Sequence, residues 1–360
     1  MTYNFDLITN HLSKISLKKN ILKSRSQVKH SPSFIQQMPQ VSIAMATYNG
    51  EKYLRAQLES IVAQTEMPTE VIISDDGSTD NTVEIAETFQ APFDIRVLPQ
   101  HERLGFADNF LYAAEHCRCP LVMFCDQDDI WLPQKLAISR RQLVQTRSLI
   151  LLHALSMVDC NLNLIELLSQ GIDKTMTYGP LTLDPYLCGY GNTMIFRREL
   201  LTLWPRDHRP SVGDGVISHD TWLYTLAAAL GPVAHLADSY ILYRRHGVNL
   251  SNLDDRNKLQ RLADIGTFDV RTHVQRAEFN GRMADIFLAI SGSYTHWAPR
   301  SAKAAQEYRL REALIRDRIA LYCGERFMQR LASFRKVQQS RWKQAGSTKS
   351  KALPAGKDLF

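Results

Sequence analysis

The chain has 360 residues, 44% of them hydrophobic and 22% charged, and a formal net charge of +6. Its longest apolar stretch, residues 222–234, is too short to cross a bilayer, and the first residues lack the apolar core and cleavage site of a signal peptide. Six cysteines are scattered through the chain, and Cys117 and Cys119 have no partner pair to make a zinc site, so we expect reduced thiols. We therefore expect a cytoplasmic protein with one main domain, a large core and an appendage.

Positive charge is concentrated at the two ends of the chain. Residues 1–40 carry six lysines and arginines against one acid, and residues 301–360 carry fourteen against five, which leaves about −8 for residues 41–300. Basic ends favour an anionic surface, either the membrane headgroups at the inner face of the cell membrane or a lipid-diphosphate acceptor. The sequence has no aromatic-interleaved basic patch or zinc finger, so we expect no nucleic-acid partner.

Repeated strand–loop–helix units predict the first part of the fold. Three apolar runs are each followed by a polar loop and a pattern with helical spacing, and a fourth run ends in acidic residues. The predicted strands are residues 41–46, 71–73, 94–98 and 121–125. One predicted helix starts near Tyr53, a second runs from about Asn81 to Phe89, and a third runs through Asn109 to about Cys117. Asp80 or Thr79 is expected to cap the second helix. This alternation is typical of a doubly wound, parallel α/β sheet.

Polar residues stand where three of these strands end. They are Thr47, Tyr48 and Asn49 after the first strand, Asp75 and Asp76 after the second, and Asp126, Gln127, Asp128 and Asp129 after the fourth. Ligands of open α/β sheets bind at the carboxyl ends of the strands. Three carboxylates without an interleaved lysine or arginine suit Mg²⁺ or Mn²⁺ better than zinc, and such an ion would hold a diphosphate. A solvated acidic turn or a helix cap is the alternative for the last group.

Together, these three groups resemble the signature segments of the family 2 glycosyltransferases of the GT-A fold, and the resemblance runs from about residue 41 to about residue 252. The sequence of residues 126–131, Asp-Gln-Asp-Asp-Ile-Trp, is similar to the corresponding motif of a bacterial subgroup often described as rhamnosyltransferases of surface polysaccharide synthesis. The resemblance implies a Rossmann-like α/β fold: a mixed, mostly parallel sheet flanked by helices, with a C-terminal helical appendage. It also implies the inverting transfer of a sugar, with rhamnose as a candidate, from a nucleotide-diphospho-sugar to a growing bacterial surface glycan or a lipid-linked saccharide.

The residues after the first two strands are candidates for binding the nucleotide. Asp75 and Asp76 can accept a hydrogen bond from the ring N–H that uracil and thymine carry at N3, which favours a UDP- or dTDP-sugar. Tyr48 can lie against the base or the ribose, while Thr47 and Asn49 can shape the end of the strand. The sequence Asp-Gly-Ser is also ordinary turn chemistry, and this reading stays open, above all for Asp75.

The resemblance implies that the acidic segment binds a divalent metal ion, Mg²⁺ or Mn²⁺. Asp128 would bridge the ion and the diphosphate oxygens, where the ion stabilises the negative charge of the leaving group. Asp126 would contact the ribose or a metal-bound water, and Asp129 would orient the loop.

Basic residues follow a further predicted strand at residues 240–243. Arg244 and Arg245 could contact phosphate oxygens, because a guanidinium gives bidentate contacts. His246 is the positional match for a histidine that completes the metal ligand set in many GT-A enzymes. A lone histidine is more often structural than a ligand, so both readings of His246 stay open.

A glycine-rich segment precedes another predicted strand. Gly189 and Gly191 indicate a close approach of the backbone to something else, or a bulge. The resemblance implies that this loop lies beside the donor sugar and the acceptor, with Asn192, Trp131 and His219 in the same group. A tight turn in a mixed sheet accounts for the glycines equally well.

Asp220 opens a predicted helix and matches the position of the family's general base. An inverting transfer removes a proton from the acceptor hydroxyl as that oxygen attacks the anomeric carbon from the face opposite the nucleotide. A carboxylate beside a closed, partly apolar pocket would have a raised pKa, which suits a base near neutral pH. Aspartate at a helix start is also a common N-cap, and the two roles are compatible. His219 stands where the family more often has glutamate, so its role is open.

The resemblance and the charge pattern divide the chain into four parts. They are a basic arm (1–40), the catalytic domain (41–252, with a nucleotide-binding half 41–130 and an acceptor half 131–252), a helical C-terminal region (253–345) and a disordered tail (346–360). Residues 310–337 have the spacing of a basic amphipathic helix, which fits a bilayer surface or packing on the catalytic domain or a partner chain.

Other nucleotide-binding classes fit the sequence less well. A nicotinamide-dependent oxidoreductase needs G-x-G-x-x-G after its first strand, and a P-loop enzyme needs Gly-Lys-Ser/Thr; the sequence has neither. A nucleotidyltransferase usually begins with a glycine-rich, lysine-bearing phosphate loop, which is absent near Thr47. A sugar-nucleotide-binding protein without transfer activity is the remaining alternative. It predicts erosion of the acids, whereas Asp76, Asp126, Asp128 and Asp220 are present.

Overall fold

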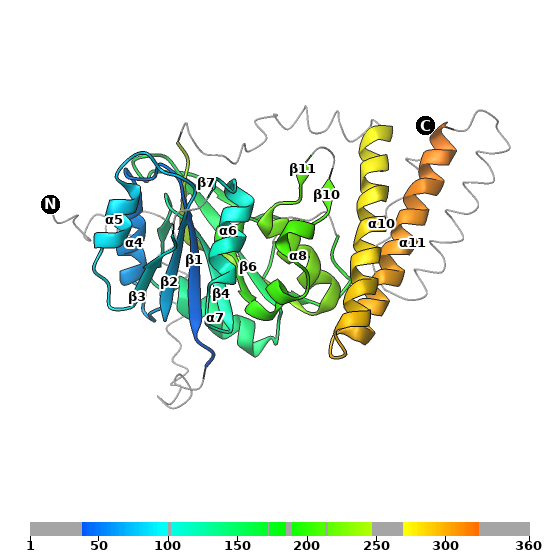
Figure 1. Cartoon of the computed structure of the whole chain (residues 1–360), viewed down its shortest axis with the longest axis horizontal. Helices are drawn as coiled ribbons and strands as arrows, with labels where there is room; N and C mark the ends of the chain where they lie inside the picture. The colour runs from blue at the N-terminus through cyan, green and yellow to red at the C-terminus, as the bar shows by residue number, and fades with distance from the viewer. Residues whose placement is uncertain are drawn as a thin grey trace. The chain divides into compact units, whose positions relative to one another are not determined.

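The computed structural model describes residues 38–99, 102–171, 173–184, 189–212, 215–246 and 269–323 (Figure 1). Several predicted segments lie outside the described residues. They are most of the basic arm, residues 247–268, the end of the predicted amphipathic helix (324–337) and the predicted disordered tail (346–360).

The centre of the fold is one ten-stranded sheet. Its strands are β1 (Val41–Thr47), β2 (Glu70–Asp75), β3 (Asp94–Val97), β4 (Leu121–Asp126), β5 (Ile130–Trp131), β6 (Ile150–Val158), β7 (Leu164–Leu168), β8 (Met176–Tyr178), β9 (Ile195–Arg197) and β12 (Val233–Arg244). The order across the sheet is β3-β2-β1-β4-β9-β6-β12-β5, with β7 paired to β6 and β8 paired to β12. Two further short strands, β10 (Ser211–Val212) and β11 (Gly215–Val216), pair with each other.

Strand direction divides the sheet into two parallel blocks. Strands β3, β2, β1 and β4 form the first block, and β6 and β12 form the second. Strand β9 lies between the blocks and is antiparallel to both β4 and β6. The predicted α/β fold, a mixed, mostly parallel sheet flanked by helices, is confirmed. The parallel arrangement suggested by the first strand–helix units ends at β4, because an apolar run records burial and carries no information on strand direction.

Helices cover both faces of the sheet (Figure 1). They are α4 (Leu54–Val62), α5 (Thr82–Thr88), α6 (Phe106–Glu115), α7 (Lys135–Gln145) and α8 (His219–Leu230). Neighbouring residues of β1 face opposite sides. Ile43 joins an apolar cluster with Leu58 of α4 and Leu143 of α7, whereas Ala44 joins a second cluster with Phe110 of α6. Burial on both faces explains why β1, β2 and β4 read as continuous apolar runs.

Two long helices form the described part of the predicted C-terminal helical region. These helices, α10 (Val270–Ser293) and α11 (Ala298–Cys323), run side by side and pack against each other (Figure 1). Phe287 of α10 belongs to the same apolar cluster as α8, and the Tyr294 hydroxyl donates a hydrogen bond to the Thr202 carbonyl at 2.6 Å. The described helices therefore pack on the sheet domain. Every helix in the described ranges is too short or too polar to span a bilayer.

Three elements differ from the sequence-based expectation. Residues 159–184 carry few regular signals in the sequence but contain β7 and β8, whose mostly exposed side chains give no buried-strand pattern. The strand predicted at residues 240–243 is the end of the much longer β12. Helix α7 is not predicted from the sequence. Some of its basic and polar residues are buried together with its apolar ones, so its buried face shows no apolar pattern.

The cap of α5 also differs from the prediction. Asn81 is the N-cap residue and makes no side-chain cap hydrogen bond, so the predicted caps Asp80 and Thr79 are wrong. The Asp80 carboxylate instead accepts hydrogen bonds from the backbone N–H of Thr82 (3.0 Å) and Glu51 (3.1 Å). It therefore ties the start of α5 to the loop after β1.

Candidate active site

Asp75, at the end of β2, organises the turn that follows it. Its Oδ1 accepts hydrogen bonds from the backbone N–H of Gly77 (3.1 Å) and Ser78 (2.7 Å). Its Oδ2 accepts from the hydroxyls of Thr47 (2.7 Å) and Ser78 (2.6 Å). Gly77 has φ +88°, a conformation that side chains other than glycine rarely adopt. The carboxylate of Asp75 is therefore fully engaged in local turn chemistry, which was the open alternative for this residue.

Asp76 links the turn after β2 to the start of α6. Its Oδ1 accepts from the backbone N–H of Leu104 at 2.6 Å, and its Oδ2 accepts from that of Gly105 at 3.1 Å. Arg103 Nε lies 3.6 Å from the same Oδ2, and the Arg103 guanidinium lies over the Tyr48 ring at 4.2 Å from its centroid. Asp76 and Tyr48 thus belong to one cluster held around Arg103.

Gln127 joins the loop after β1 to the acidic loop after β4. Its side-chain amide accepts from the Tyr48 N–H (2.9 Å) and donates to the Tyr48 carbonyl (2.9 Å). A Cβ on Gly50 would lie 2.1 Å from Gln127 Oε1, so any side chain at this position would displace the Gln127 amide. Asn49 has φ +47°, and its side-chain oxygen accepts from the Thr79 N–H at 2.8 Å. The sequence predicts no separate role for Gln127 within the acidic segment 126–129.

Asp128 and His246 meet at the edge of the sheet. His246 Nε2 lies 2.8 Å from Asp128 Oδ2, and both side chains remain about 15% exposed. The His246 ring stacks on Tyr53 with 4.8 Å between ring centroids. The Arg244 guanidinium lies 4.7 Å from the Tyr53 ring centroid, and Arg244 Nε donates to the Asp128 carbonyl at 2.9 Å. Arg245, by contrast, has an exposed side chain.

Asp129, the residue after Asp128, is completely buried. Its Oδ2 accepts from the Asn192 side-chain amide at 2.6 Å, and its Oδ1 accepts from the Arg244 backbone N–H at 3.1 Å. Burial, followed by the charges of Asp128 and Asp126, raises the pKa of Asp129 well above its ordinary value. Both carboxylate oxygens of Asp129 therefore hold neighbouring segments together.

Asp126 lies between the acidic loop and the start of α8. Burial raises the pKa of Asp126 to about 7, with further contributions from the charges of Asp128 and Asp220. The positive charge of Lys135 and a hydrogen bond from the Asn192 side chain act in the opposite direction. Carboxylates from β4, the acidic loop and α8 are thus close enough to influence one another's protonation.

Asp220 is in the first turn of α8 but does not cap it. Ser218 is the N-cap residue, so the predicted N-cap role of Asp220 is wrong. Asp220 Oδ1 accepts from the Ser218 hydroxyl and from the Thr221 N–H (2.7 Å). The side chain is half-buried. These bonds fix one carboxylate oxygen, Oδ1, next to the helix start.

His219 is enclosed by aromatic rings. It stacks on Phe110 with 4.3 Å between centroids and meets Phe124 edge-on at 4.8 Å. Within the described residues its Nδ1 has no hydrogen-bond partner. Burial lowers the pKa of His219, so the ring is neutral near pH 7.

Both predicted glycines lie where the backbone approaches another element closely. A Cβ on Gly191 would be 2.5 Å from His219 Nε2 and 3.5 Å from Asp220 Cβ, and one on Gly189 would be 1.9 Å from a methyl group of Leu152. The expected close approach is therefore found at both positions. Trp131, assigned to the same group from the sequence, lies instead in the core beneath the site, with 2% of its surface exposed.

Lys135 is the site-region residue that the sequence analysis missed. It begins α7 and is fully buried; its Nζ donates to the Asn192 carbonyl and lies 4.1 Å from the Trp131 ring centroid. Lys135 stands six residues after Asp129, and the sequence around it has no apolar pattern that would predict its burial.

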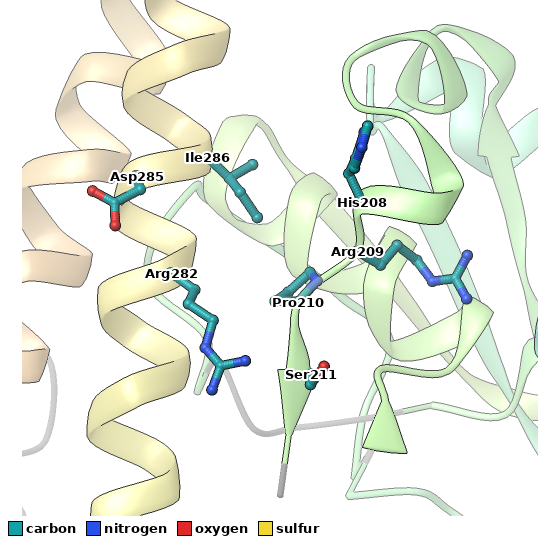
Figure 2. A pocket seen from close by; sticks show the side chains of 7 residues that line it. All are labelled: His208, Arg209, Pro210, Ser211, Arg282, Asp285 and Ile286. Atoms are coloured by element: carbon teal, nitrogen blue, oxygen red, sulfur yellow. The ribbon is translucent and has the colours of Figure 1, made fainter. Parts of the chain in front are cut away.

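The described residues contain no cluster of three His, Cys, Asp or Glu side chains arranged to bind a metal ion. The pair Asp128 and His246 supplies one carboxylate and one imidazole. A separate open cavity of about 320 Å³ lies between the turn before β10 and α10, and Figure 2 shows its lining side chains directed to different sides. None of the predicted site residues lines this cavity.

The sequence of the sheet domain is similar to known glycosyltransferases. Residues 42–203 match the model of the glycosyl transferase family 2. A dTDP-rhamnosyl transferase, RfbG of Shigella flexneri, is 29% identical over 234 residues, which cover 61% of this chain and 78% of that protein. A glycosyltransferase of Nostoc sp., alr2836, is 31% identical over 227 residues, covering 58% and 66%. The crystal structure of S. aureus TarS 1–349 in complex with UDP-GlcNAc aligns with 77% of this chain and 91% of that one, at 20% identity and a TM-score of 0.47.

Proposed function

Through residues 42–203 this chain belongs to the family 2 glycosyltransferases, and we propose that it transfers a sugar from a nucleotide-diphospho-sugar to a growing bacterial surface glycan or a lipid-linked saccharide, with inversion at the anomeric carbon. The observation that supports this most is that Asp126, at the end of β4, is close enough to Asp128 and to Asp220 in the first turn of α8 for their charges to raise its pKa. This arrangement combines a diphosphate site with a carboxylate that can accept a proton.

The donor in this proposal is a dTDP- or UDP-sugar, with dTDP-rhamnose as the first candidate. The relative named as a dTDP-rhamnosyl transferase supports this choice. In this proposal Asp76 accepts the base N3–H in addition to its hydrogen bonds from the backbone N–H of Leu104 and Gly105. Asp75 accepts four hydrogen bonds from Thr47, Gly77 and Ser78 and is assigned to the turn. Tyr48, held in place by Arg103 and Gln127, lies against the base or the ribose.

Asp128 and His246 are the residues that would hold Mg²⁺ or Mn²⁺, with Asp126 as the third ligand that the sequence predicts; the described residues contain no ready-made group of three. Asp128 Oδ2 and His246 Nε2 lie 2.8 Å apart, so one carboxylate oxygen and one imidazole nitrogen stand side by side where an ion would be held. Both side chains are partly exposed, so an ion with its diphosphate can reach them. When bound, the ion supplies Lewis-acid stabilisation of the charge that develops on the leaving diphosphate.

Asp220 performs the proton transfer. Its free oxygen takes the proton of the acceptor hydroxyl while the acceptor oxygen forms a bond to the anomeric carbon of the donor sugar. On the opposite face the bond from the anomeric carbon to the donor phosphate oxygen breaks, and its electron pair leaves with the nucleoside diphosphate. Neutral His219, clamped by Phe110 and Phe124, borders the base and donates no positive charge to it.

The proposed place of action is the cytoplasmic side of the cell membrane. The two basic ends of the chain, with net charges of +5 and +9, support peripheral contact with anionic headgroups or with a lipid-diphosphate acceptor.

Calorimetric titration tests the donor site. The purified chain is titrated with UDP, dTDP and GDP, with and without Mn²⁺, and release of nucleoside diphosphate from dTDP-rhamnose and UDP-GlcNAc is then measured. We expect Mn²⁺-dependent binding of dTDP or UDP in preference to GDP. Absence of diphosphate binding under every metal condition would contradict the proposed function.

A further inference from the structure

A fully buried lysine lies under the candidate active site. Lysine is almost never fully buried without a specific partner, because transfer of its charge out of water is costly. Lys135 has 0% of its surface exposed, and its ammonium group donates to the backbone carbonyl of Asn192. Its second contact is the face of Trp131, 4.1 Å from the ring centroid, which gives a cation–π interaction.

The partner of Lys135 is the residue that also holds the acidic loop. The Asn192 side-chain amide donates to Asp129 Oδ2 at 2.6 Å, while its main-chain carbonyl accepts from Lys135. One residue of the glycine-rich loop is therefore held at its main chain by the Lys135 amino group and at its side chain by the Asp129 carboxyl group. Burial lowers the pKa of Lys135 to about 7, but the nearby Cys125, Asp129 and Asp126 act to raise it.

The same loop packs directly against the proposed base. Gly191, which precedes Asn192, comes so close to α8 that an added Cβ would lie 2.5 Å from His219 Nε2 and 3.5 Å from Asp220 Cβ. A displacement of the loop backbone at Asn192 would therefore change the packing of Gly191 against the first residues of α8.

We propose that Lys135 is a positioning residue for glycosyl transfer: its buried ammonium group holds residues 189–193 against the start of α8 and thereby fixes the orientation of Asp220. The inference rests on the proposed function, since it concerns the base of that reaction. Stability alone does not account for a lysine here, because an apolar residue of similar volume in place of a buried charge is often neutral or stabilising.

The first test replaces Lys135 by methionine, which keeps the length of the side chain and removes its charge. In the Lys135→Met protein we expect kcat to fall by about 10- to 100-fold, as small misplacements of catalytic groups do, while KM for the donor stays the same. Lys135→Arg, which keeps the charge, should retain more kcat than Lys135→Met. A kcat close to that of the wild type in Lys135→Met overturns the proposal, as does an equal loss in both variants.

A double-mutant cycle tests whether Lys135 acts through the loop. In Gly191→Ala the added methyl group would press against His219 and push the loop away from α8. Like Lys135→Met, this variant should lower kcat. If both residues act on one loop position, the double variant should be little worse than the worse single variant. Independent, additive losses overturn the proposal. If Lys135→Met does not fold, Lys135→Gln, which also removes the charge, takes its place in the cycle.

Leu143→Ala is the matched stability control, because Leu143 is a buried residue of the same helix α7 and lies outside the site. It should lower the melting temperature without changing kcat. Amide hydrogen exchange of residues 189–193 gives a readout that does not depend on activity. Exchange should accelerate in Lys135→Met, and unchanged exchange overturns the proposal. If the wild type shows neither nucleotide binding nor transfer, the proposed function fails, and this exchange measurement still decides the role of Lys135.

Discussion

Asp128 Oδ2 and His246 Nε2 lie 2.8 Å apart, although 118 positions separate the two residues in the chain. Asp128 follows β4, in the first parallel block of the sheet, and His246 follows β12, in the second. The contact therefore joins the loop after the first parallel block to the loop after the second, at the carboxyl ends of their strands. Arg244 supports it from one side through the Asp128 carbonyl, and Tyr53 supports it through the His246 ring.

Asp128→Asn should weaken Mn²⁺-dependent binding of dTDP or UDP by at least about 10-fold, because an amide is a poorer ligand than a carboxylate. His246→Gln should act in the same direction. Calorimetric titrations with and without Mn²⁺ measure both effects. Glu87→Gln, an exposed acid on α5, is the control and should bind as the wild type does. Unchanged Mn²⁺ dependence in Asp128→Asn would remove Asp128 from the metal site.

Asp220→Asn should lower kcat by about 10²- to 10⁴-fold, the usual contribution of a general base, and leave donor affinity intact. Ser218→Ala, which removes a hydrogen-bond donor to the same carboxylate, should give a smaller loss. Steady-state kinetics and nucleotide titration separate the two effects. Loss of folding or of donor binding in Asp220→Asn would contradict its assignment as the base.

Asp75 and Asp76 should respond differently to the same substitution. Asp75→Asn places an amide N–H₂ among groups that donate to the carboxylate, so it should reduce the free energy of unfolding by about 1–3 kcal/mol. Folded Asp75→Asn protein should still bind UDP. Asp76→Asn should weaken binding of UDP and dTDP in the folded protein, because it alters the partner of the base N3–H.

Urea unfolding measures the stability of both variants, and calorimetry measures their affinity. If Asp75→Asn loses nucleotide affinity and Asp76→Asn keeps it, the two roles are reversed.

His235 should make the protein less stable in acid. Burial lowers its pKa from 6.5 to about 4, so the unfolded chain takes up the proton first as the pH falls. The stability due to neutral His235 is complete above about pH 6.5 and is lost progressively as the pH falls from about 6.5 to about 4, an effect of the order of 3 kcal/mol. Urea unfolding at pH 7.5, 5.5 and 4.5 should show this loss in the wild type. His235→Phe, which keeps an aromatic ring beside Tyr178 and Tyr224, should lose less stability over the same range.

The parts of the fold that could be predicted from the sequence are those whose signal is local. Strands β1, β2 and β4 are buried on both faces, so each appears as a short apolar run that ends in polar residues. Strands β7 and β8 are largely exposed and lack that signal, and α7 buries Lys135 and Arg140 beside its apolar residues, which disguises its buried face.

The candidate site divides in the same way. The sequence by itself determined that Asp75, Asp76 and Asp126–Asp129 stand at strand ends, because the alternation of apolar and polar residues fixes where a buried strand stops. Only the tertiary structure decided how these acids are used. Asp75 accepts from its own turn, Asp76 from the start of α6, and Asp129 from Asn192 and Arg244.

The contacts that assemble the site join segments distant in sequence. His246 reaches Asp128, and Lys135 reaches Asn192, only because the antiparallel strand β9 joins the two parallel blocks and brings their loops to one edge. Sequence periodicity reports which side of an element is buried, whereas it contains no information about which buried element lies opposite. That pairing is fixed by packing and strand order, so the positions of the proposed metal ligands and of the buried lysine could be found only in the folded chain.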